Sequence, residues 1–424
     1  MSASAIDPPR AAVNAKLTGI IASAAVGLGV LLSGFVLREP APYEIYMGML
    51  ISVWAMFGLR ISRGPLPLLT LLILFNIGGL ISLTQTADLG DTPLYIAVSI
   101  FLALTAVFFA AITEARPAFF RLIFLAWTGA ALATAMLGIL AYFDAVPGAA
   151  LFTRYGRATG GFEDPNVFGP FLALPAIFLL HRLMTGSVAR MPLYALPLII
   201  IVAGVLLSFS RGAWGLFASC ALFLTAALFL QSNSGAFRLR IAMMSVTACA
   251  SLILFVLAAL QIPAIADLFT ERAQLVQDYD GSRMGRLSRY GPGFLMAMEH
   301  PLGIGPLTFR RIFGEDTHNI WLKTLLDYSW LGFAAYLLLI VWTLAAGFRI
   351  LFRDRPWQPY FLCAYVVFAG HVALGTIIDT DHWRHFYLLL GMVWGGIGLE
   401  ARRAHVERHS GLVASAIRSS TVST

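Results

Sequence analysis

Apolar runs long enough to cross a lipid bilayer recur along this chain from Leu17 to Glu400. At a helical rise of about 1.5 Å per residue, about 20 apolar residues cross a hydrocarbon core that is about 30 Å thick. The runs lack the alternation of apolar and polar residues that marks strands, so we predict helices. Of the 424 residues 59% are hydrophobic and only 12% are charged, and the mean hydropathy is +0.80. These values exclude an ordinary soluble globular protein.

We therefore expect an all-α, polytopic integral membrane protein with about 12 transmembrane helices. The predicted spans lie near 17–37, 43–60, 66–84, 93–113, 118–143, 167–183, 191–208, 212–230, 240–261, 320–348, 357–377 and 385–400. The longest loop, at about 262–317, contains short segments of helical character. This pattern divides the chain into a tail at 1–16, a transmembrane domain at 17–400 and a second tail at 401–424.

Most arginine and lysine residues fall in the tails and in alternate short loops. They are Arg10, Lys16, Arg60, Arg63, Arg116, Arg121, Arg182, Arg190, Arg238, Arg240, Arg349, Arg353, Arg355, Arg402, Arg403 and Arg408. Because cytoplasmic loops carry an excess of such residues, we predict that both termini are cytoplasmic and that the 262–317 loop lies outside. Anionic membrane lipids account for the net charge of +7 without a nucleic-acid partner.

Several other arginines lie on the predicted outer side, where the topology gives no reason for them. They are Arg154, Arg157, Arg211, Arg272, Arg283, Arg286, Arg289, Arg310, Arg311 and Arg384. A single arginine there usually anchors its helix at the membrane interface. A convergent set is different, because guanidinium groups keep their charge and bind phosphate oxygens through paired N–H donors. We therefore expect an anionic, phosphate-bearing ligand, for which a polyprenyl pyrophosphate is the natural candidate in a membrane.

Two short stretches place arginines at turns between spans. In RYGRATGGFEDPN, residues 154–166, the paired glycines and Asp-Pro-Asn predict a tight turn after Arg157. In SFSRGAW, residues 208–214, Arg211 lies where two spans meet. A plain turn and an interfacial hairpin remain the structural alternatives for these two stretches.

A third stretch, SRMGRLSRYGPGFLMAMEHPLG, begins at Ser282. Its arginines at 283, 286 and 289 are three residues apart, so they share one face if the segment is helical. The Gly-Pro pair before FLMAMEH and the proline and glycine after it predict a short helix on the membrane surface. A basic amphipathic helix that binds lipid headgroups is the alternative interpretation.

Polar residues crowd the stretch EDTHNIWLKTLLDYSWLG, which starts at Glu315. We expect Asp316 or Thr317 to cap the helix that enters the bilayer, with His318 in its first turn. The positive end of the helix dipole disfavours protonation, so a neutral His318 could act as a general base for a sugar hydroxyl. Lys323 and Asp327, four residues apart, fit an ion pair on the same helix.

The sequence gives little support for a metal site. Asp379-x-Asp381, in the last outer loop, comes close to the Asp-x-Asp motif of metal-dependent glycosyltransferases, but no outer cluster has the composition of a divalent-cation cage. We expect no metal and no other cofactor. Cys220, Cys249 and Cys363 fall within spans and fit small packing residues.

Four stretches together resemble the bacterial O-antigen ligase and O-antigen polymerase family. They are Arg-x-x-Gly-Gly-Phe with Asp-Pro-Asn, Ser-x-Ser-Arg before a span, Gly-Arg followed by His-Pro-Leu-Gly-Ile-Gly-Pro, and His-Asn-x-x-Leu. The resemblance covers Arg157 to about Gly332. Four such motifs in this order, all on the predicted outer side, are more specific than any one of them.

The resemblance implies a GT-C-like, metal-independent glycosyltransferase of the bacterial inner membrane, with its site facing the periplasm. Family members move a glycan, with inversion, from undecaprenyl pyrophosphate to an acceptor hydroxyl. The acceptor is lipid A-core for ligases and another lipid-linked repeat unit for polymerases; we favour the ligase. By match to the family motifs, His318, Arg211 and Arg286 would be catalytic, and Arg289, Arg283, Arg157, Asn166 and Asn319 would bind substrate.

Two other classes of function stay open from the residues alone. A transporter of lipid-linked glycans would also have about 12 spans, and Asn76 and His371 lie inside spans where polar groups often mark a transport path. Such a protein usually shows internal repeats with broken helices, which this sequence lacks. A non-enzymatic scaffold gives no reason for outer arginines. We interpret His371 as a hydrogen-bonded packing residue.

Overall fold

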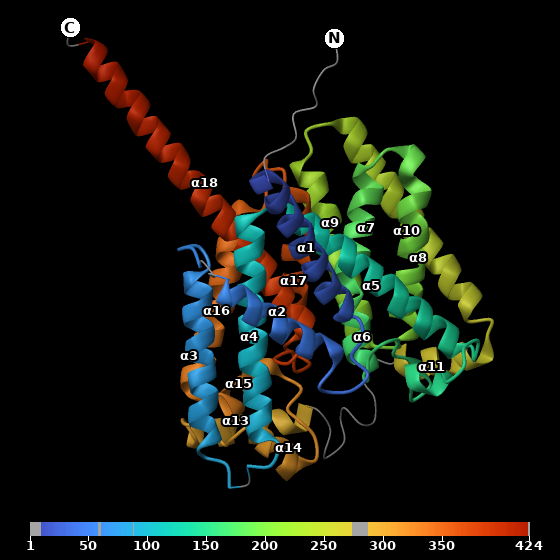
Figure 1. The fold of residues 1–424 in the computed structure, drawn as a ribbon. Helices are drawn as coiled ribbons and strands as arrows, with labels where there is room; N and C mark the ends of the chain where they lie inside the picture. Colours follow the sequence, from blue (N-terminus) through green and yellow to red (C-terminus); the bar gives the residue numbers. More distant parts are fainter. Residues whose placement is uncertain (1–9, 58–60, 88, 274–286, 423–424) are drawn as a thin grey trace.

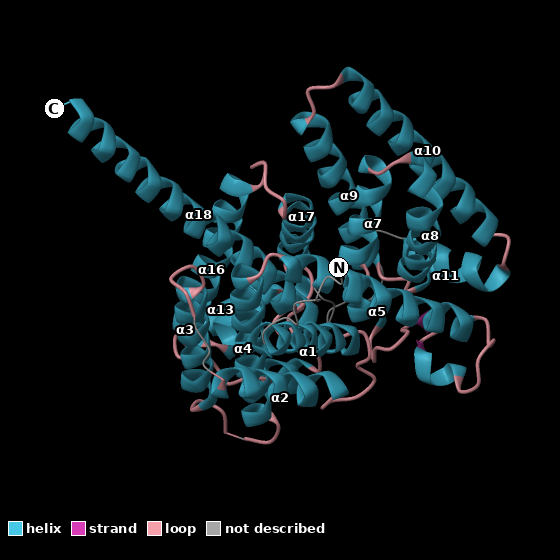
Figure 2. Ribbon diagram, turned by 45° about the horizontal axis from the view of Figure 1, so that its top comes forward, coloured by secondary structure: helices cyan, strands magenta, loops and turns pink. Residues whose placement is uncertain are grey.

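The structure is a computed structural model that describes residues 10–57, 61–87, 89–273 and 287–422, and these are almost entirely helical (Figure 2). The first half contains α1 (Arg10–Leu32), α2 (Pro42–Met56), α3 (Leu66–Leu83), α4 (Thr92–Ala115), α5 (Ala118–Tyr142), η1 (Ala149–Phe152), β1 (Thr153–Arg154), β2 (Arg157–Ala158), α6 (Pro165–Phe171), α7 (Ala173–Thr185), η2 (Val188–Arg190) and α8 (Met191–Leu207). The second half contains α9 (Arg211–Gln231), α10 (Gly235–Ala259), α11 (Pro263–Ala273), η3 (Leu287–Arg289), α13 (Tyr290–Glu299), α14 (Thr308–Phe313), α15 (Ile320–Asp327), α16 (Ser329–Ile350), α17 (Gln358–Leu374) and α18 (Arg384–Val422).

Within the described residues, nine helical segments are long and apolar enough to cross a membrane. The prediction of an all-α polytopic membrane protein is confirmed. Each of the 12 predicted spans overlaps one helix or two consecutive helices. Helices α2 and α17 have only 15 and 17 residues and are not among the nine. The twelfth span corresponds to the first turns of α18, also outside the nine.

The helices run mainly between two ends of the molecule (Figure 1). The start of α1 and the projecting C-terminal part of α18 lie at the top of this view. At the bottom lie α13, α14 and α15, which define what we call the α15 end. The two short strands of the hairpin lie beside α5 and α11, where Figure 2 shows them in magenta.

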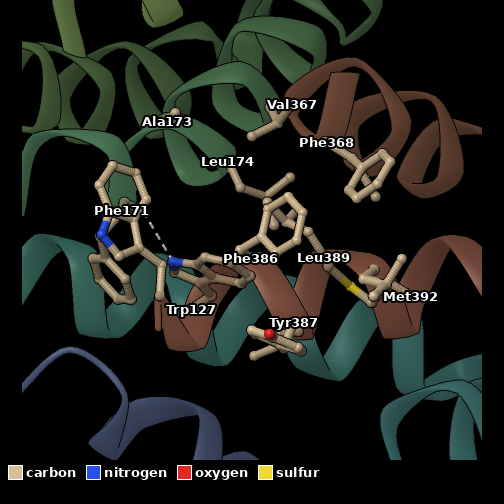
Figure 3. Close-up of a cluster of buried hydrophobic side chains, with 14 of the residues drawn as sticks. Trp127, Phe171, Ala173, Leu174, Val367, Phe368, Phe386, Tyr387, Leu389 and Met392 are labelled. Carbon is tan, nitrogen blue, oxygen red and sulfur yellow. Dashed lines mark hydrogen bonds between the residues drawn. The ribbon is translucent and has the colours of Figure 1, made fainter. Parts of the chain in front are cut away.

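The core contains aromatic and aliphatic side chains from α5, α6, α7, α17 and α18 (Figure 3). Every residue from Phe361 to Phe368 of α17 is buried, as expected for a helix that is apolar around its whole circumference. Pro175 has no N–H to donate to the carbonyl of Phe171, one turn earlier. The indole N–H of Trp127 donates to this carbonyl instead, at 3.1 Å.

The predicted span at 320–348 is wrong in one respect, because the chain breaks between α15 and α16. Ser329 has a φ of 63°, and the N–H of Trp330 donates to Pro301 O at 3.0 Å instead of continuing the helix. The carbonyl of Leu326 is occupied by the N–H of Ile304 at 2.9 Å and by the hydroxyl of Ser82 at 3.1 Å. The loop before α14 therefore takes over hydrogen bonds that a continuous helix would have made.

Helices α3 and α16 pack against each other through glycine. A Cβ atom at Gly78 would lie 2.2 Å from Tyr328 O and 2.5 Å from the N atom of Gly332. Tyr328 stacks on Phe75 with 4.0 Å between the ring centroids. Small residues allow such close backbone approach between membrane helices. The packing fixes the start of α16, and through it the end of α15.

Replacing Gly78 tests this close approach. We expect Gly78→Ala to destabilise the protein by about 1–3 kcal/mol, because the new methyl group overlaps backbone atoms that cannot move aside independently. The matched control is Gly129→Ala in α5, where an added Cβ meets nothing within 4 Å. Thermal unfolding in detergent should show a lower midpoint for Gly78→Ala alone. Equal midpoints for the two variants would contradict the described packing.

Candidate functional site at the α15 end

Arg157 is buried at the hairpin and holds the turn that the sequence predicted. It lies opposite Arg154 in the β1–β2 register and is 6% exposed. Its Nε donates to Ser208 O at 2.7 Å and its Nη2 donates to Asn166 Oδ1 at 2.9 Å. Asp164 caps α6 by accepting from the N–H of Asn166 at 2.8 Å. Arg157 therefore joins the hairpin to the end of α8 and the start of α6.

Arg211 is the first residue of α9 and is partly exposed. Ser210 caps this helix through a hydrogen bond from the N–H of Ala213 to its hydroxyl, at 3.4 Å. Arg157 contacts Ser208, three residues before Arg211, so both arginines belong to the α8–α9 junction. The N-terminus of a 21-residue helix adds its own positive end of the dipole to this junction.

His318 lies in the loop before α15, between two carboxylates. Its Nδ1 is 3.7 Å from Asp379 Oδ2, and its Nε2 is 3.8 Å from Glu315 Oε2. Its backbone N–H donates to Asp379 Oδ2 at 3.3 Å. The side chain is 29% exposed, and the residue has a φ of 50°, a conformation uncommon outside glycine. The imidazole is therefore accessible and held in an electronegative surrounding.

The expected helix cap is wrong, because Asn319 caps α15 rather than Asp316 or Thr317. The Oδ1 of Asn319 accepts from the N–H of Leu322 at 3.1 Å, and its Nδ2 donates to Thr376 O at 3.0 Å. His318 consequently precedes the helix instead of lying in its first turn. Asn319 also acts as a bridge to the end of α17, so its side chain is already engaged with the protein.

The His318 loop and the Arg211 helix both pack on the end of α17. The N–H of Ile320 donates to Gly375 O at 2.8 Å. A Cβ at Gly212 would lie 2.9 Å from Leu374 Cδ1. The structure therefore brings His318, Arg211 and Arg157 to the α15 end. Arg283 and Arg286 lie outside the described residues.

Arg289 holds the His318 loop from the side of α13. Its Nη1 donates to Asp316 O at 3.0 Å, and its Nη2 lies 2.5 Å from Glu315 Oε2. Glu315 thus contacts both Arg289 and His318.

Helix α13 begins at Tyr290, before the Gly-Pro pair that was expected to break it. Proline is tolerated there because the first turn of a helix has no partner for its N–H.

Asp379 and Asp381 experience opposite electrostatic effects although they are two residues apart. Burial raises the pKa of Asp379 to about 7, and the positive charge of Lys323 only partly opposes this. Burial acts in the same direction on Asp381, but the charges of His382 and Lys323 and hydrogen bonds from His382 and Tyr95 hold its pKa below the usual range. Of these two aspartates, Asp379, which lies beside His318, is therefore the one that can change protonation near neutral pH.

An apolar cavity of about 400 Å³ adjoins the α8–α9 junction. It lies among α5, α8, α9, α10 and α11, and its walls include Phe143, Phe209, Trp214 and Phe269. Phe209 is two residues from Arg211. Trp214 stacks on Phe269 with 5.5 Å between the ring centroids. An apolar cavity thus lies next to the start of α9, where Arg211 is located.

Several site residues were not assigned from the sequence. Asp379 was considered only as part of a metal motif, and Glu315 only as part of a polar stretch. Asp379 lies in the loop between α17 and α18, and its contact with His318 is not apparent from local sequence.

The ion pair of Lys323 and Asp327 was predicted, and their atoms Nζ and Oδ2 are 2.9 Å apart. In the described part of the chain, no group of three or more His, Cys, Asp or Glu residues could hold a metal ion.

The fold defines a polytopic, all-α membrane protein with arginine, histidine and carboxylate side chains gathered at one end. A family model described as O-antigen ligase matches residues 196–337, a range that contains Arg211, Arg289 and His318. These residues are therefore similar to the O-antigen ligase family, and the match supports a membrane enzyme of the ligase or polymerase type. No curated protein matches its sequence.

The two hairpin arginines provide a test of the α8–α9 junction. We expect Arg157→Lys to weaken the junction by about 1–3 kcal/mol, because lysine cannot replace both donors and leaves buried acceptors unsatisfied. Hydrogen exchange followed by mass spectrometry should be about tenfold or more faster over residues 158–168. The matched control is Arg154→Lys on the facing strand, where the guanidinium is exposed and pairs with Glu163 at 3.2 Å. Equal exchange in the two variants would rule out this role for Arg157.

Proposed function

We propose that this protein is an O-antigen ligase-type glycosyltransferase. It would move a glycan from undecaprenyl pyrophosphate to a hydroxyl of lipid A-core, with inversion and without a metal, at the periplasmic side of the bacterial inner membrane. One observation carries this proposal: His318, held between two carboxylates, lies at the same end as the Arg211 helix start and its adjoining apolar cavity. These are the parts that a lipid pyrophosphate donor and a hydroxyl acceptor require.

The donor would bind with its pyrophosphate at the start of α9. Arg211 would donate paired hydrogen bonds to phosphate oxygens, and the N-terminus of α9 would add its dipole. Arg286 is assigned as a second phosphate ligand, with Arg283 as its neighbour, both by their sequence motif. The isoprenoid chain would occupy the apolar cavity beside Phe209 and Trp214.

Arg157, Asn166, Arg289 and Asn319 contribute less directly than their sequence motifs suggest. Each makes hydrogen bonds within the protein that fix a loop of the site. We propose that they keep the donor and acceptor groups in place, with contact to substrate through their remaining surface. Their loss would therefore affect geometry as well as binding.

The reaction needs positive charge and a base. The acceptor oxygen attacks the anomeric carbon from the face opposite the phosphate, the carbon–oxygen bond to phosphate breaks, and the configuration inverts. Undecaprenyl pyrophosphate leaves with the bonding electron pair, and the arginines stabilise its charge. His318 accepts the proton of the acceptor hydroxyl through the nitrogen that faces the substrate. Asp379 would hold the opposite ring nitrogen and stabilise the imidazolium.

Substitution of His318 tests the base. We expect His318→Ala to remain folded and to reduce transfer by about 10²- to 10⁴-fold, the usual contribution of a positioned acid–base group. The matched control is His300→Ala, which removes an exposed histidine after α13, outside the proposed site. The assay uses purified lipid-linked glycan and acceptor with a chelator present. Wild-type transfer by His318→Ala would exclude the general-base role.

Arg211→Lys is the companion test for the phosphate site. It keeps the charge but loses the paired planar donors, so we expect a substantial loss of transfer together with weaker donor binding. Full activity in this variant would mean that charge alone suffices at this position.

Banding of lipopolysaccharide from a deletion strain distinguishes the ligase from its main alternative. Loss of a ligase leaves core without attached polymer while lipid-linked polymer accumulates. Loss of a polymerase leaves core with at most one repeat unit. Normal banding would direct attention to another polysaccharide or to a transport role.

A further inference from the structure

Lys323 occupies a buried acidic cluster beneath the His318 loop. Its side chain is 4% exposed, and its Nζ lies 3.1 Å from Asp316 Oδ1 and 2.9 Å from Asp327 Oδ2. The same nitrogen lies 5.3 Å from the ring centroid of Tyr95. The hydroxyl of Tyr95 donates to Asp381. A single ammonium group thus faces several oxygen atoms that would otherwise repel one another.

Lysine is rare in this chain, which makes its use here informative. The only other lysine is Lys16, and every other basic side chain apart from the histidines is an arginine. The compact ammonium group of lysine fits between carboxylates on two elements, whereas the planar fork of arginine is larger and prefers paired acceptors. Burying a lysine with two carboxylates carries a desolvation cost that their mutual attraction need not fully offset.

The cluster is continuous with the imidazole of His318. Asp316, which pairs with Lys323, is flanked by Glu315 and Thr317. The hydroxyl of Thr317 lies 3.5 Å from Asp379 Oδ1, and Glu315 and Asp379 are the carboxylates beside His318. Lys323 therefore contacts the loop directly through Asp316. It also influences the charge beside His318, because it lowers the pKa of Asp379.

We propose that Lys323 is a positioning residue that fixes the 315–318 loop and sets the charge next to the base, His318. This inference rests on the proposed function for its catalytic meaning, because His318 is the base only in that reaction. Lys323 does not touch the reacting atoms. Its ammonium group is a positive charge inside the protein, and it lowers the pKa of Asp379 next to His318.

The sign of the effect follows from the charges. Among the residues that the structure describes, the charged and titratable groups that face the cluster come from five parts of the fold. They are Glu315 and Asp316 on the loop, Lys323 and Asp327 on α15 with Tyr328 after it, Asp379, Asp381 and His382 between α17 and α18, Tyr95 on α4, and Arg289 and Tyr290 at the start of α13. Because the cation of Lys323 lowers the pKa of Asp379, its removal should raise it. A protonated Asp379 no longer stabilises the imidazolium of His318, so a neutral side chain at 323 should favour the neutral form of His318.

The test measures the reactivity of His318 with diethyl pyrocarbonate as a function of pH. The folded protein is labelled in detergent and then digested, and mass spectrometry quantifies the labelled peptides. This reagent modifies neutral imidazole, and exposed His300 serves as an internal reference. We expect Lys323→Met to move the midpoint of His318 labelling to lower pH by roughly one unit, because Asp379 then becomes neutral beside the imidazole. Lys323→Arg keeps the charge and should leave the midpoint within a few tenths of a unit. The pH at half-maximal glycan transfer should move in parallel.

A second variant keeps the inference open to contradiction if Lys323→Met does not fold. Asp327→Asn leaves Lys323 paired with Asp316 and removes a negative charge that raises the pKa of Asp379. Asp379 then stays ionised beside His318, so the His318 midpoint should move to higher pH. Unchanged His318 midpoints in the folded variants would overturn the inference even if the wild type transfers glycan. If the variant midpoints differ from the wild-type midpoint but the wild type transfers no glycan, the electrostatic coupling is supported and the proposed function is contradicted.

Discussion

Carbonyl groups at the end of α17 hold the loop on which the site depends. The last turn of a helix leaves its carbonyls without partners inside the helix, and here Gly375 and Thr376 continue that terminus. The N–H of Ile320 and the amide of Asn319 donate to these two carbonyls. His318 precedes Asn319 directly, so its position is fixed by backbone groups from a different helix. The same terminus packs on Gly212, next to Arg211, and so sets His318, the proposed base, and the start of α9 relative to each other.

Burial then decides how the charged groups of this end behave. Charges withdrawn from water are costly unless they are paired, and the α15 end pairs them across several elements. Lys323 lies between Asp316 and Asp327, Arg289 contacts Glu315, and Asp381 receives bonds from Tyr95 and His382. Asp379 differs from Asp381 in that burial raises its pKa to about 7. An enzyme that deprotonates a hydroxyl benefits from such a group beside its base, since small changes in charge there alter proton affinity.

Much of the fold could be predicted from the sequence because a membrane imposes simple requirements on length and polarity. The helix that starts at Arg211 and the Lys323–Asp327 pair followed from local spacing alone. The cap of α15 did not, because Asp316, Thr317 and Asn319 are all good caps and the choice depends on Thr376. The break at Ser329 depends on Ile304 and Ser82, which occupy a carbonyl from outside the helix. The contact of Asp379 with His318 likewise joins segments that only the tertiary fold brings together.

The central claim is that a lipid pyrophosphate binds at the α8–α9 junction within reach of His318. The most direct measurement is an electron cryomicroscopy structure of the full chain with a non-transferable undecaprenyl pyrophosphate analogue bound. The account predicts phosphate density within hydrogen-bonding distance of Arg211 and isoprenoid density in the cavity beside Phe209 and Trp214. Phosphate density at the end of the molecule opposite α15, or an isoprenoid chain remote from this cavity, would contradict it.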